Sequence, residues 1–178
     1  MAALPEIPLV SVEEYLATSY PDGDREYLDG IVVERNLGSD DRSALQHIID
    51  VHLGAHAKRL QLAVRPQCRT RITESRYRVP DVTVMMRPYQ KGRALVDAPF
   101  QIVEILSPDD RLKDAIRRFQ DYASVGVPHI LLMDPEARET FVFSSGTLTQ
   151  RDVTGFDVPE RGFLPFDSRE LLAELDEE

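Results

Sequence analysis

The sequence predicts an α/β (α+β) fold in which a mixed central β-sheet is flanked by helices. Segments with the apolar pattern of strands are interspersed with segments whose apolar residues recur at helical spacing. A strand, a helix and a strand follow one another between residues 100 and 134, and this order implies a crossover connection and at least one parallel pair of strands. The 178 residues, 42% of them apolar and 29% charged, suit one domain with a core.

In the first half of the chain, a capping box, a hairpin turn and a helical stripe predict the elements. Ser11 followed by Glu14 forms a capping box, which opens a short helix. Asp29-Gly30 is typical of a two-residue turn between short strands. Apolar residues from Leu45 to Leu60 then recur on one face of a helix. The expected elements are a helix at 11–19, strands at 25–28 and 31–35, a helix at 43–60 and a strand-like segment at 61–72.

In the second half of the chain, runs of apolar residues predict buried strands. The second long helix is expected to have Ser107 as its N-cap and Pro108 at its first position. Its apolar residues share one face, as in an amphipathic helix. The expected elements are strands at 81–86 and 100–106, a helix at 109–124, strands at 128–134, 138–143 and 147–152, and a short acidic helix near 168–175.

The composition excludes several classes of protein. No apolar run approaches the ~18 residues of a membrane span, and the first residues lack the charged-then-apolar pattern of a signal peptide. The single cysteine, Cys68, excludes an intrachain disulfide and a cysteine-cluster metal site. We therefore expect a soluble, cytoplasmic protein without a membrane partner.

The net charge of −10 argues against a nucleic-acid partner, but its distribution weakens that argument. Residues 1–30 carry a net charge of −6 and residues 167–178 carry −5, which leaves +1 for residues 31–166. The segment 58–78 holds seven basic residues against one acid, Glu74. Most of these are arginines, whose planar guanidinium suits phosphate. A solvated surface segment is the structural alternative.

Two carboxylates at buried strand positions are the main candidates for chemistry. Glu104 lies within FQIVEILSP, residues 100–108, where a carboxylate is costly unless it is paired, hydrogen-bonded or bound to a metal. Asp81 follows Pro80, which lacks an N–H donor and suits the first position of a strand. Two converging carboxylates repel each other unless a cation lies between them, and Mg²⁺ or Mn²⁺ is the simplest such cation. A salt bridge at Glu104 and a turn role for Asp81 remain open.

Two pairs of polar residues on helices each allow two interpretations. Asp114 and Arg118 stand four residues apart, so they form a surface pair unless Arg118 leans over the end of the Glu104 strand. His52 and His56 have a spacing that can bind zinc, but the segment lacks the glutamate of the metalloprotease motif. Ordinary surface or interface histidines are the alternative.

Four motifs, in a specific order and spacing, point to a known family. The arrangement resembles the large bacterial family of restriction endonucleases with a PD-(D/E)xK nuclease fold. The resemblance extends from about residue 10 to 155. It implies a single nuclease-like domain over residues 1–178, with its core at about 10–155 and an acidic C-terminal segment at 167–178. The motifs are REYLDG at 25–30, VPDVTV at 79–84, IVEILSPDDR at 102–111 and RRFQDYASVGVPHILLMDPEAR at 117–138.

This resemblance implies a metal-dependent endonuclease that hydrolyses phosphodiester bonds in DNA, with Mg²⁺ or Mn²⁺ as its cofactor. It assigns Asp81 and Glu104 to the metal, helped by Glu26 and by a backbone carbonyl near Ile105. Family members often carry the residue types of Gln67 and Tyr122 at these positions, which implies supporting roles. If nucleic acid binds, the basic segment is expected to contact phosphate groups through Arg69, Arg71, Arg76 and Arg78.

The sequence departs from the family pattern at two positions. Leu106 stands where the E-x-K lysine would fall, and the position on the following helix to which the family moves that lysine, four residues after Asp114, is Arg118. An arginine cannot accept a proton from water, but it can stabilise negative charge on a phosphoryl group, so we count Arg118 among the catalytic residues. Lys113 is nearby on another face, and Arg42 replaces a frequent histidine. The alternative function is a catalytically degenerate nuclease fold that serves in binding or as a homodimer.

Overall fold

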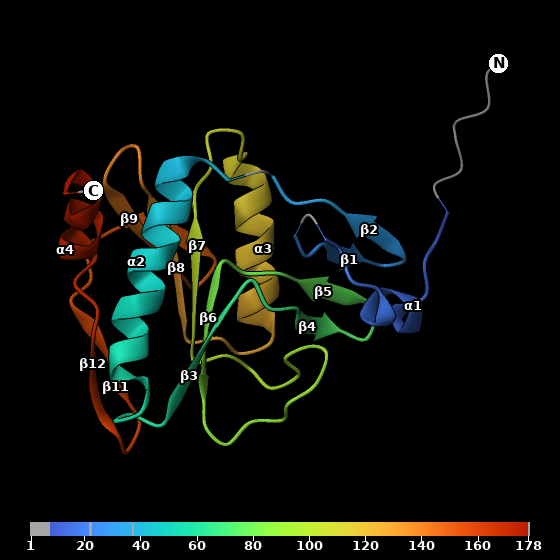
Figure 1. The fold of residues 1–178 in the computed structure, drawn as a ribbon, viewed down its shortest axis with the longest axis horizontal. Coiled ribbons are helices and arrows are strands. Elements are labelled where there is room, and N and C mark those ends of the chain that lie inside the picture. The colour runs from blue at the N-terminus through green and yellow to red at the C-terminus, as the bar shows by residue number, and fades with distance from the viewer. Residues whose placement is uncertain (1–7, 22, 37, 178) are drawn as a thin grey trace.

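The centre of the protein is a six-stranded mixed sheet (Figure 1). The structure is a computed structural model, which describes residues 8–21, 23–36 and 38–177. The strand order of this sheet is β10-β9-β8-β7-β6-β3. Within the sheet, β7 and β8 form the parallel pair that the sequence predicts. The bounds are β3 (Leu62–Pro66), β6 (Val82–Met86), β7 (Gln101–Ile105), β8 (His129–Asp134), β9 (Glu139–Ser144) and β10 (Thr147–Gln150).

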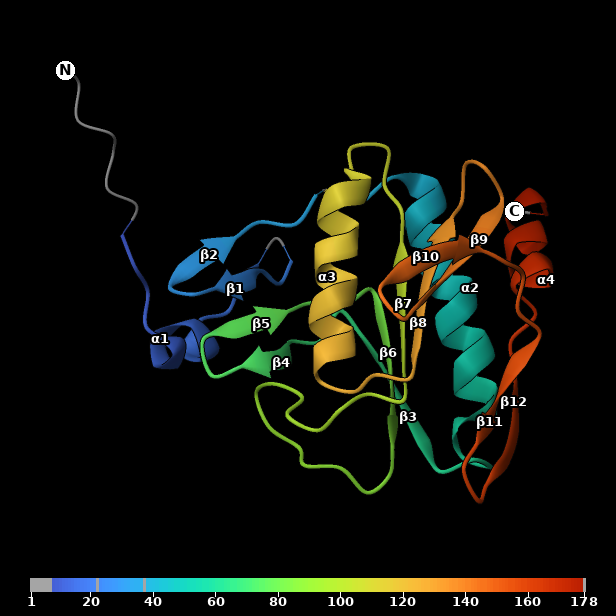
Figure 2. The same ribbon diagram turned by 180° about the vertical axis from the view of Figure 1, so that it is seen from behind.

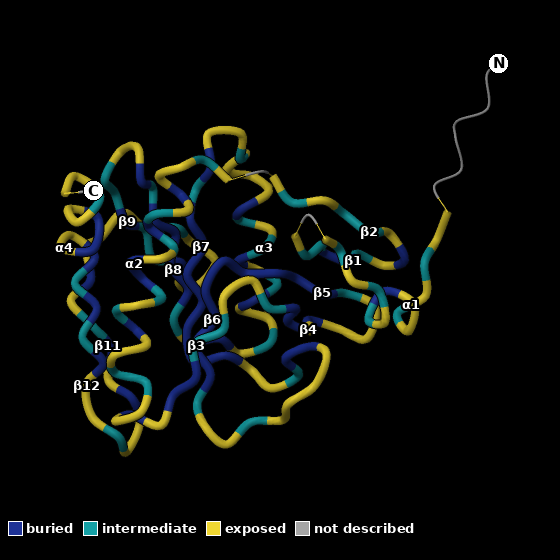
Figure 3. Tube along the Cα trace, viewed as in Figure 1, coloured by how far each residue is buried: buried dark blue, intermediate teal, exposed yellow. Residues whose placement is uncertain are grey.

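Two long helices cover opposite faces of this sheet (Figures 1 and 2). Alternate residues along β7 explain the arrangement: Val103 packs in the same core cluster as α2 (Asp40–Ala57), whereas Ile102 packs with α3 (Leu112–Ser124). Both faces of β7 are therefore apolar, and the chain is buried along most of β6, β7 and β8 (Figure 3). None of the helices in the described ranges is long and apolar enough to cross a membrane.

A second, four-stranded sheet in the order β2-β1-β5-β4 lies beside the first. Ser11 is the N-cap of α1 (Val12–Ala17), as predicted, and its Oγ accepts a hydrogen bond from the Glu14 N–H (3.1 Å). That helix packs on the sheet through Tyr15, whose ring stacks on that of Tyr27 at 4.9 Å. The strands are β1 (Glu26–Leu28), β2 (Ile31–Val33), β4 (Thr70–Thr73) and β5 (Arg76–Arg78).

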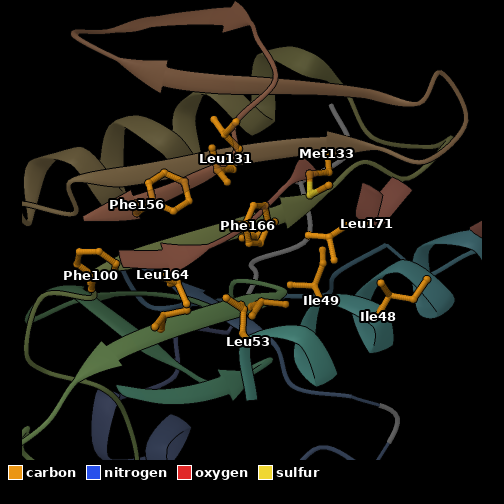
Figure 4. Packing of buried hydrophobic residues seen from close by; sticks show 14 of the residues in the cluster. Ile48, Ile49, Leu53, Phe100, Leu131, Met133, Phe156, Leu164, Phe166 and Leu171 are labelled. Carbon is orange, nitrogen blue, oxygen red and sulfur yellow. The ribbon is translucent and has the colours of Figure 1, made fainter. Parts of the chain in front are cut away.

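The C-terminal part of the chain completes the main core. A hairpin of β11 (Gly155–Val158) and β12 (Gly162–Pro165) leads to α4 (Ser168–Ala173) and a 3₁₀ turn, η1 (Glu174–Asp176). Side chains of α2, the hairpin and α4 gather on one face of the central sheet (Figure 4). The core thus extends past residue 155, since Leu164, Leu171 and Leu172 are buried in it.

The structure corrects several expected boundaries. The strand-like segment 61–72 is two strands in different sheets, because the chain turns at Gln67, which has a left-handed φ of 45°. Ser107 does not cap α3, and its hydroxyl, which is buried, has no hydrogen-bond partner. The Ser107 N–H donates to Asp110 Oδ2 (2.9 Å) in a turn, and the helix begins only at Leu112. β5, β11 and β12 were not predicted from the sequence.

Candidate active site

Asp81 immediately precedes β6, an interior strand of the central sheet, and its side chain is fully buried. It precedes β6, one residue beyond the antiparallel pair of Val82 and Val103, and this register places Asp81 beside Glu104. Its Oδ2 accepts a hydrogen bond from the Ile105 N–H (2.8 Å). Its Oδ1 accepts from two guanidinium groups, those of Arg35 and Arg42, the latter at 2.6 Å. Asp81 is thus held on both oxygens and is not a turn residue at the surface.

Glu104 is the second buried carboxylate, with its side chain 3% exposed. Its Oε1 accepts a hydrogen bond from the Tyr122 hydroxyl (2.5 Å), and Arg118 Nε lies 3.8 Å from the same oxygen. Burial raises the pKa of Glu104 to about 7; Arg118 opposes this rise and the neighbouring Asp81 adds to it.

Arg118 leans over the Glu104 strand, which is one of the two arrangements that the sequence allows. Asp114 pairs instead with Arg117, at 3.6 Å. The Arg118 side chain reaches the site from the second turn of α3, and its Nη2 is also 4.0 Å from Asp110 Oδ1. The Tyr122 hydroxyl comes from the next turn of the same helix, so one face of α3 supplies both partners of Glu104.

Glu26 reaches the same cavity from the second sheet, but it is held in an ion pair. Its Oε2 accepts a hydrogen bond from Arg78 Nη1 (2.6 Å), and Arg78 also binds Asp121 at 2.7 Å. Among the residues that the structure describes, no three acidic, histidine or cysteine side chains are grouped to hold a metal ion. Glu26 thus lines the same cavity as Glu104, with its carboxylate paired to Arg78.

Two cavities meet at the arginines that bind Asp81. The first, of about 470 Å³, is lined by Glu26, Glu104, Arg78, Arg118 and three aspartates of the 109–114 segment. The second, of about 490 Å³, is lined by Gln46 and Gln67, whose amides are joined by a 3.1 Å hydrogen bond. The residues that line both are Arg35, Asn36 and Arg42. Gln67 therefore lies in the second cavity, away from Tyr122.

The arginines expected to contact phosphate have different surroundings. Arg69 is buried and binds Asp24 at 2.6 Å together with the backbone carbonyls of Tyr15 and Thr18. Arg78 is buried against Glu26, as described above, and Arg76 pairs with Asp29 and Asp121 at 2.7 and 3.2 Å. Arg71 is exposed on β4. Of these four side chains, Arg71 is exposed and Arg76 is 36% exposed, whereas Arg69 and Arg78 are buried in ion pairs.

The histidine pair on α2 is part of the packing. The rings of His52 and His56 are 5.2 Å apart, and His52 Nε2 lies 2.9 Å from the carbonyl oxygen of Pro165. His52 also meets the ring of Phe166 edge to face. This nitrogen joins α2 to the end of β12.

Comparison with models of protein families identifies the family of the chain. Residues 12–167 match the model of the Uma2 family, which carries the description "Putative restriction endonuclease". The chain belongs to this family. The resemblance inferred from the four motifs is thereby confirmed.

One of the similar solved structures shows the same fold. The chain is similar to the crystal structure of a "putative nuclease belonging to DUF820" from Anabaena variabilis, with a TM-score of 0.76 and 20% identity over 93% of this chain and 99% of that one. It also matches part of the cryoEM structure of a DrdV–DNA complex, with a TM-score of 0.42 and 18% identity over 75% of this chain and 11% of that one. A comparison with curated proteins finds no match. The Anabaena structure confirms the mixed α+β, restriction-endonuclease-like fold.

Sequence reasoning identified both carboxylates but missed the two arginines on Asp81 as site residues. Arg35 and Arg42 are 46 and 39 residues from Asp81 along the chain. In the sequence, Arg42 was noted only as the residue that replaces a histidine frequent in the family. Arg35 lies in the coil after β2 and belongs to none of the four motifs. A buried acid requires a partner, but the sequence does not show which arginine supplies it.

Proposed function

We propose that the protein is a metal-dependent nuclease that hydrolyses phosphodiester bonds in DNA, with Asp81 and Glu104 as the metal ligands. The observation that carries this proposal is the pair of adjacent buried carboxylates, of which Glu104 lines a polar cavity together with arginines. Membership of a family described as restriction endonucleases supports it.

The donor set suits a hard divalent cation. Mg²⁺ in enzymes is commonly held by one or two carboxylates, with water and substrate phosphate completing its shell, so a third carboxylate is not required. Burial, with a smaller contribution from the charge of Asp81, raises the pKa of Glu104, and a bound cation would favour the ionised form of this carboxylate. A bound Mg²⁺ or Mn²⁺ would lower the pKa of a water ligand and neutralise developing charge.

The neighbouring side chains would orient the ligands and the substrate. The Tyr122 hydroxyl fixes one oxygen of Glu104, and the Ile105 N–H fixes one oxygen of Asp81. Burial lowers the pKa of Arg118, but Glu104 and the smaller effects of Tyr122, Glu26 and Asp110 together outweigh burial and raise that pKa, so the group keeps its charge. Arg118 can therefore stabilise negative charge on the phosphoryl group, but it cannot accept a proton from water.

Cleavage assays on plasmid and linear DNA with millimolar Mg²⁺ or Mn²⁺ test this proposal. We expect Asp81→Asn and Glu104→Gln to abolish cleavage and Arg118→Ala to reduce it by about 10²-fold, because one electrostatic contact to the transition state is lost. Arg118→Lys should retain or increase cleavage, since it keeps the positive charge. Arg169→Ala, which removes an exposed arginine on α4, is the control and should cleave like the wild type.

Each result has a distinct meaning once circular dichroism shows that the variants are folded. If Arg118→Ala cleaves as well as the wild type while Glu104→Gln is inactive, the catalytic role of Arg118 is refuted. If every protein, the wild type included, is inert on DNA with either metal, the nuclease proposal fails.

One observation favours a second candidate, a nuclease fold that binds without turnover. Arginines already hold Asp81, and Arg78 holds Glu26, so these carboxylates have counter-charges within the chain. A melting temperature that Mg²⁺ and Mn²⁺ leave unchanged, in a protein that binds DNA but does not cleave it, would support this alternative, because a ligand of the folded state must stabilise it.

A further inference from the structure

A divalent cation that approaches Asp81 meets two positive charges already in place. Both guanidinium groups donate to Oδ1, and the buried carboxylate has no access to bulk water. Like charges at such short range in a buried site repel strongly. Metal binding at Asp81 therefore requires at least one arginine to move away.

The two arginines differ in how firmly they are held. Arg42 belongs to the first turn of α2, and its Nη1 also donates to the Asn36 carbonyl (3.3 Å). Arg35 lies in the coil between β2 and α2, and within the described residues its guanidinium has Asp81 as its hydrogen-bond partner. Displacing Arg35 costs less free energy than displacing Arg42, because Arg35 lies in coil and has one hydrogen-bond partner among the described residues, whereas Arg42 lies in a helix and has two. Arg35 is therefore the arginine that moves.

Arg35 has a place to go once it leaves Asp81. It lines both cavities, and its side chain is 16% exposed against 11% for Arg42. Because an arginine stays protonated, its charge can leave Asp81 only if the side chain moves. A displaced guanidinium in these cavities would be well suited to bind a phosphate group of a nucleic acid in bidentate fashion.

We infer that Arg35 is an exchangeable counter-cation, which neutralises Asp81 in the free protein and transfers to a substrate phosphate when metal takes its place. This inference rests on the proposed function. Its consequence is that metal and nucleic acid bind cooperatively, because the phosphate provides the partner that Arg35 needs after it leaves Asp81. By linkage, each ligand must raise the affinity for the other by the same factor.

Calorimetric titration of Mn²⁺ into the full chain, with and without a saturating short DNA duplex that has a non-hydrolysable backbone, measures this coupling without turnover. In the wild type we expect DNA to tighten Mn²⁺ binding by about tenfold or more, within the usual range of coupling. Arg35→Gln should bind Mn²⁺ more tightly than the wild type without DNA, because a competing cation is gone, and DNA should add little. Arg42→Gln is the matched control: it also relieves repulsion, but it keeps Arg35 and should keep the tightening by DNA.

The outcomes separate this inference from the proposed function. If Arg35→Gln binds Mn²⁺ no more tightly than the wild type, or if DNA tightens binding equally in both, Arg35 is a fixed partner and the exchange is refuted. If neither the wild type nor Arg35→Gln binds Mn²⁺ more than Asp81→Asn does, with or without DNA, the metal site itself fails and the proposed function fails with it.

Discussion

Asp50, on the buried side of α2, is an acid outside the proposed ligand pair whose environment makes stability depend on pH. Burial raises the pKa of Asp50 to about 6, and the charge of Asp81 adds to the rise, while a hydrogen bond from Gln46 and the charge of His47 oppose it. Between pH ~4 and 6 the folded state therefore holds a proton that the unfolded chain has lost, so the free energy of unfolding falls as the pH rises through this window.

Asp50→Asn should reduce this fall. We expect the variant to lose less stability than the wild type between pH 4 and 7, by about 1 kcal/mol once solvent screening of the half-exposed side chain is allowed for. Urea unfolding at several pH values measures the difference, and Asp157→Asn, at an exposed position of β11, serves as the control. Parallel pH profiles for wild type and Asp50→Asn would contradict the prediction.

For individual residues, the sequence predicted which acidic side chains are buried but not which cations they pair with. The apolar runs around Glu104 and after Asp81 predicted that both acids are buried, and this is confirmed. The choice between a metal and an arginine as the compensating cation depends on contacts across many residues, such as that from Arg35 to Asp81. No local pattern in a single sequence encodes such contacts.

At the scale of the elements, Arg69 joins α1 to β4. Its guanidinium binds Asp24 and two carbonyls at the end of α1, and it lies 4.4 Å from the centre of the Tyr15 ring. Arg69→Met keeps the apolar stem but leaves Asp24 without its partner, so we expect a loss of about 3 kcal/mol in the free energy of unfolding. Arg71→Met, two residues further along in β4 and exposed, should change it by less than about 0.5 kcal/mol.

Urea unfolding followed by circular dichroism gives both values. Equal stability of Arg69→Met and Arg71→Met would show that the buried ion pair does not hold α1 in place.

Elements with a strong local signal were predictable, and those formed by pairing were not. The long helices and the buried strands β6, β7 and β8 follow from apolar periodicity. In β5 the sequence RYR is polar at both ends, and its strand conformation comes from pairing with β1 and β4. Ser107 and Pro108 look like a helix start, but the hydrogen bond from Ser107 to Asp110 forms a turn instead.

At the scale of the whole molecule, the charge distribution determines how nucleic acid can bind. With a net charge of −10, any DNA affinity depends on local arginines, and exposed Arg71 is one of them. We expect affinity to fall steeply between 50 and 200 mM salt, and Arg71→Ala to reduce the slope of log affinity against log salt by about 1. Fluorescence anisotropy with a labelled duplex measures these slopes, with Arg169→Ala as the control. Binding that does not depend on salt would contradict an electrostatic interface.

The late completion of the main core has a kinetic consequence for the chain as it is made. The apolar face of α2 packs against Leu164, Leu171 and Leu172, so part of its cover is synthesised about 120 residues after Leu53. At a synthesis rate of ~10 residues per second, the residues that cover this face are made on the order of 10 s after the helix itself. During this interval the apolar face of α2 lacks part of its cover, and exposed apolar surface of this kind promotes aggregation and chaperone binding until α4 packs on it.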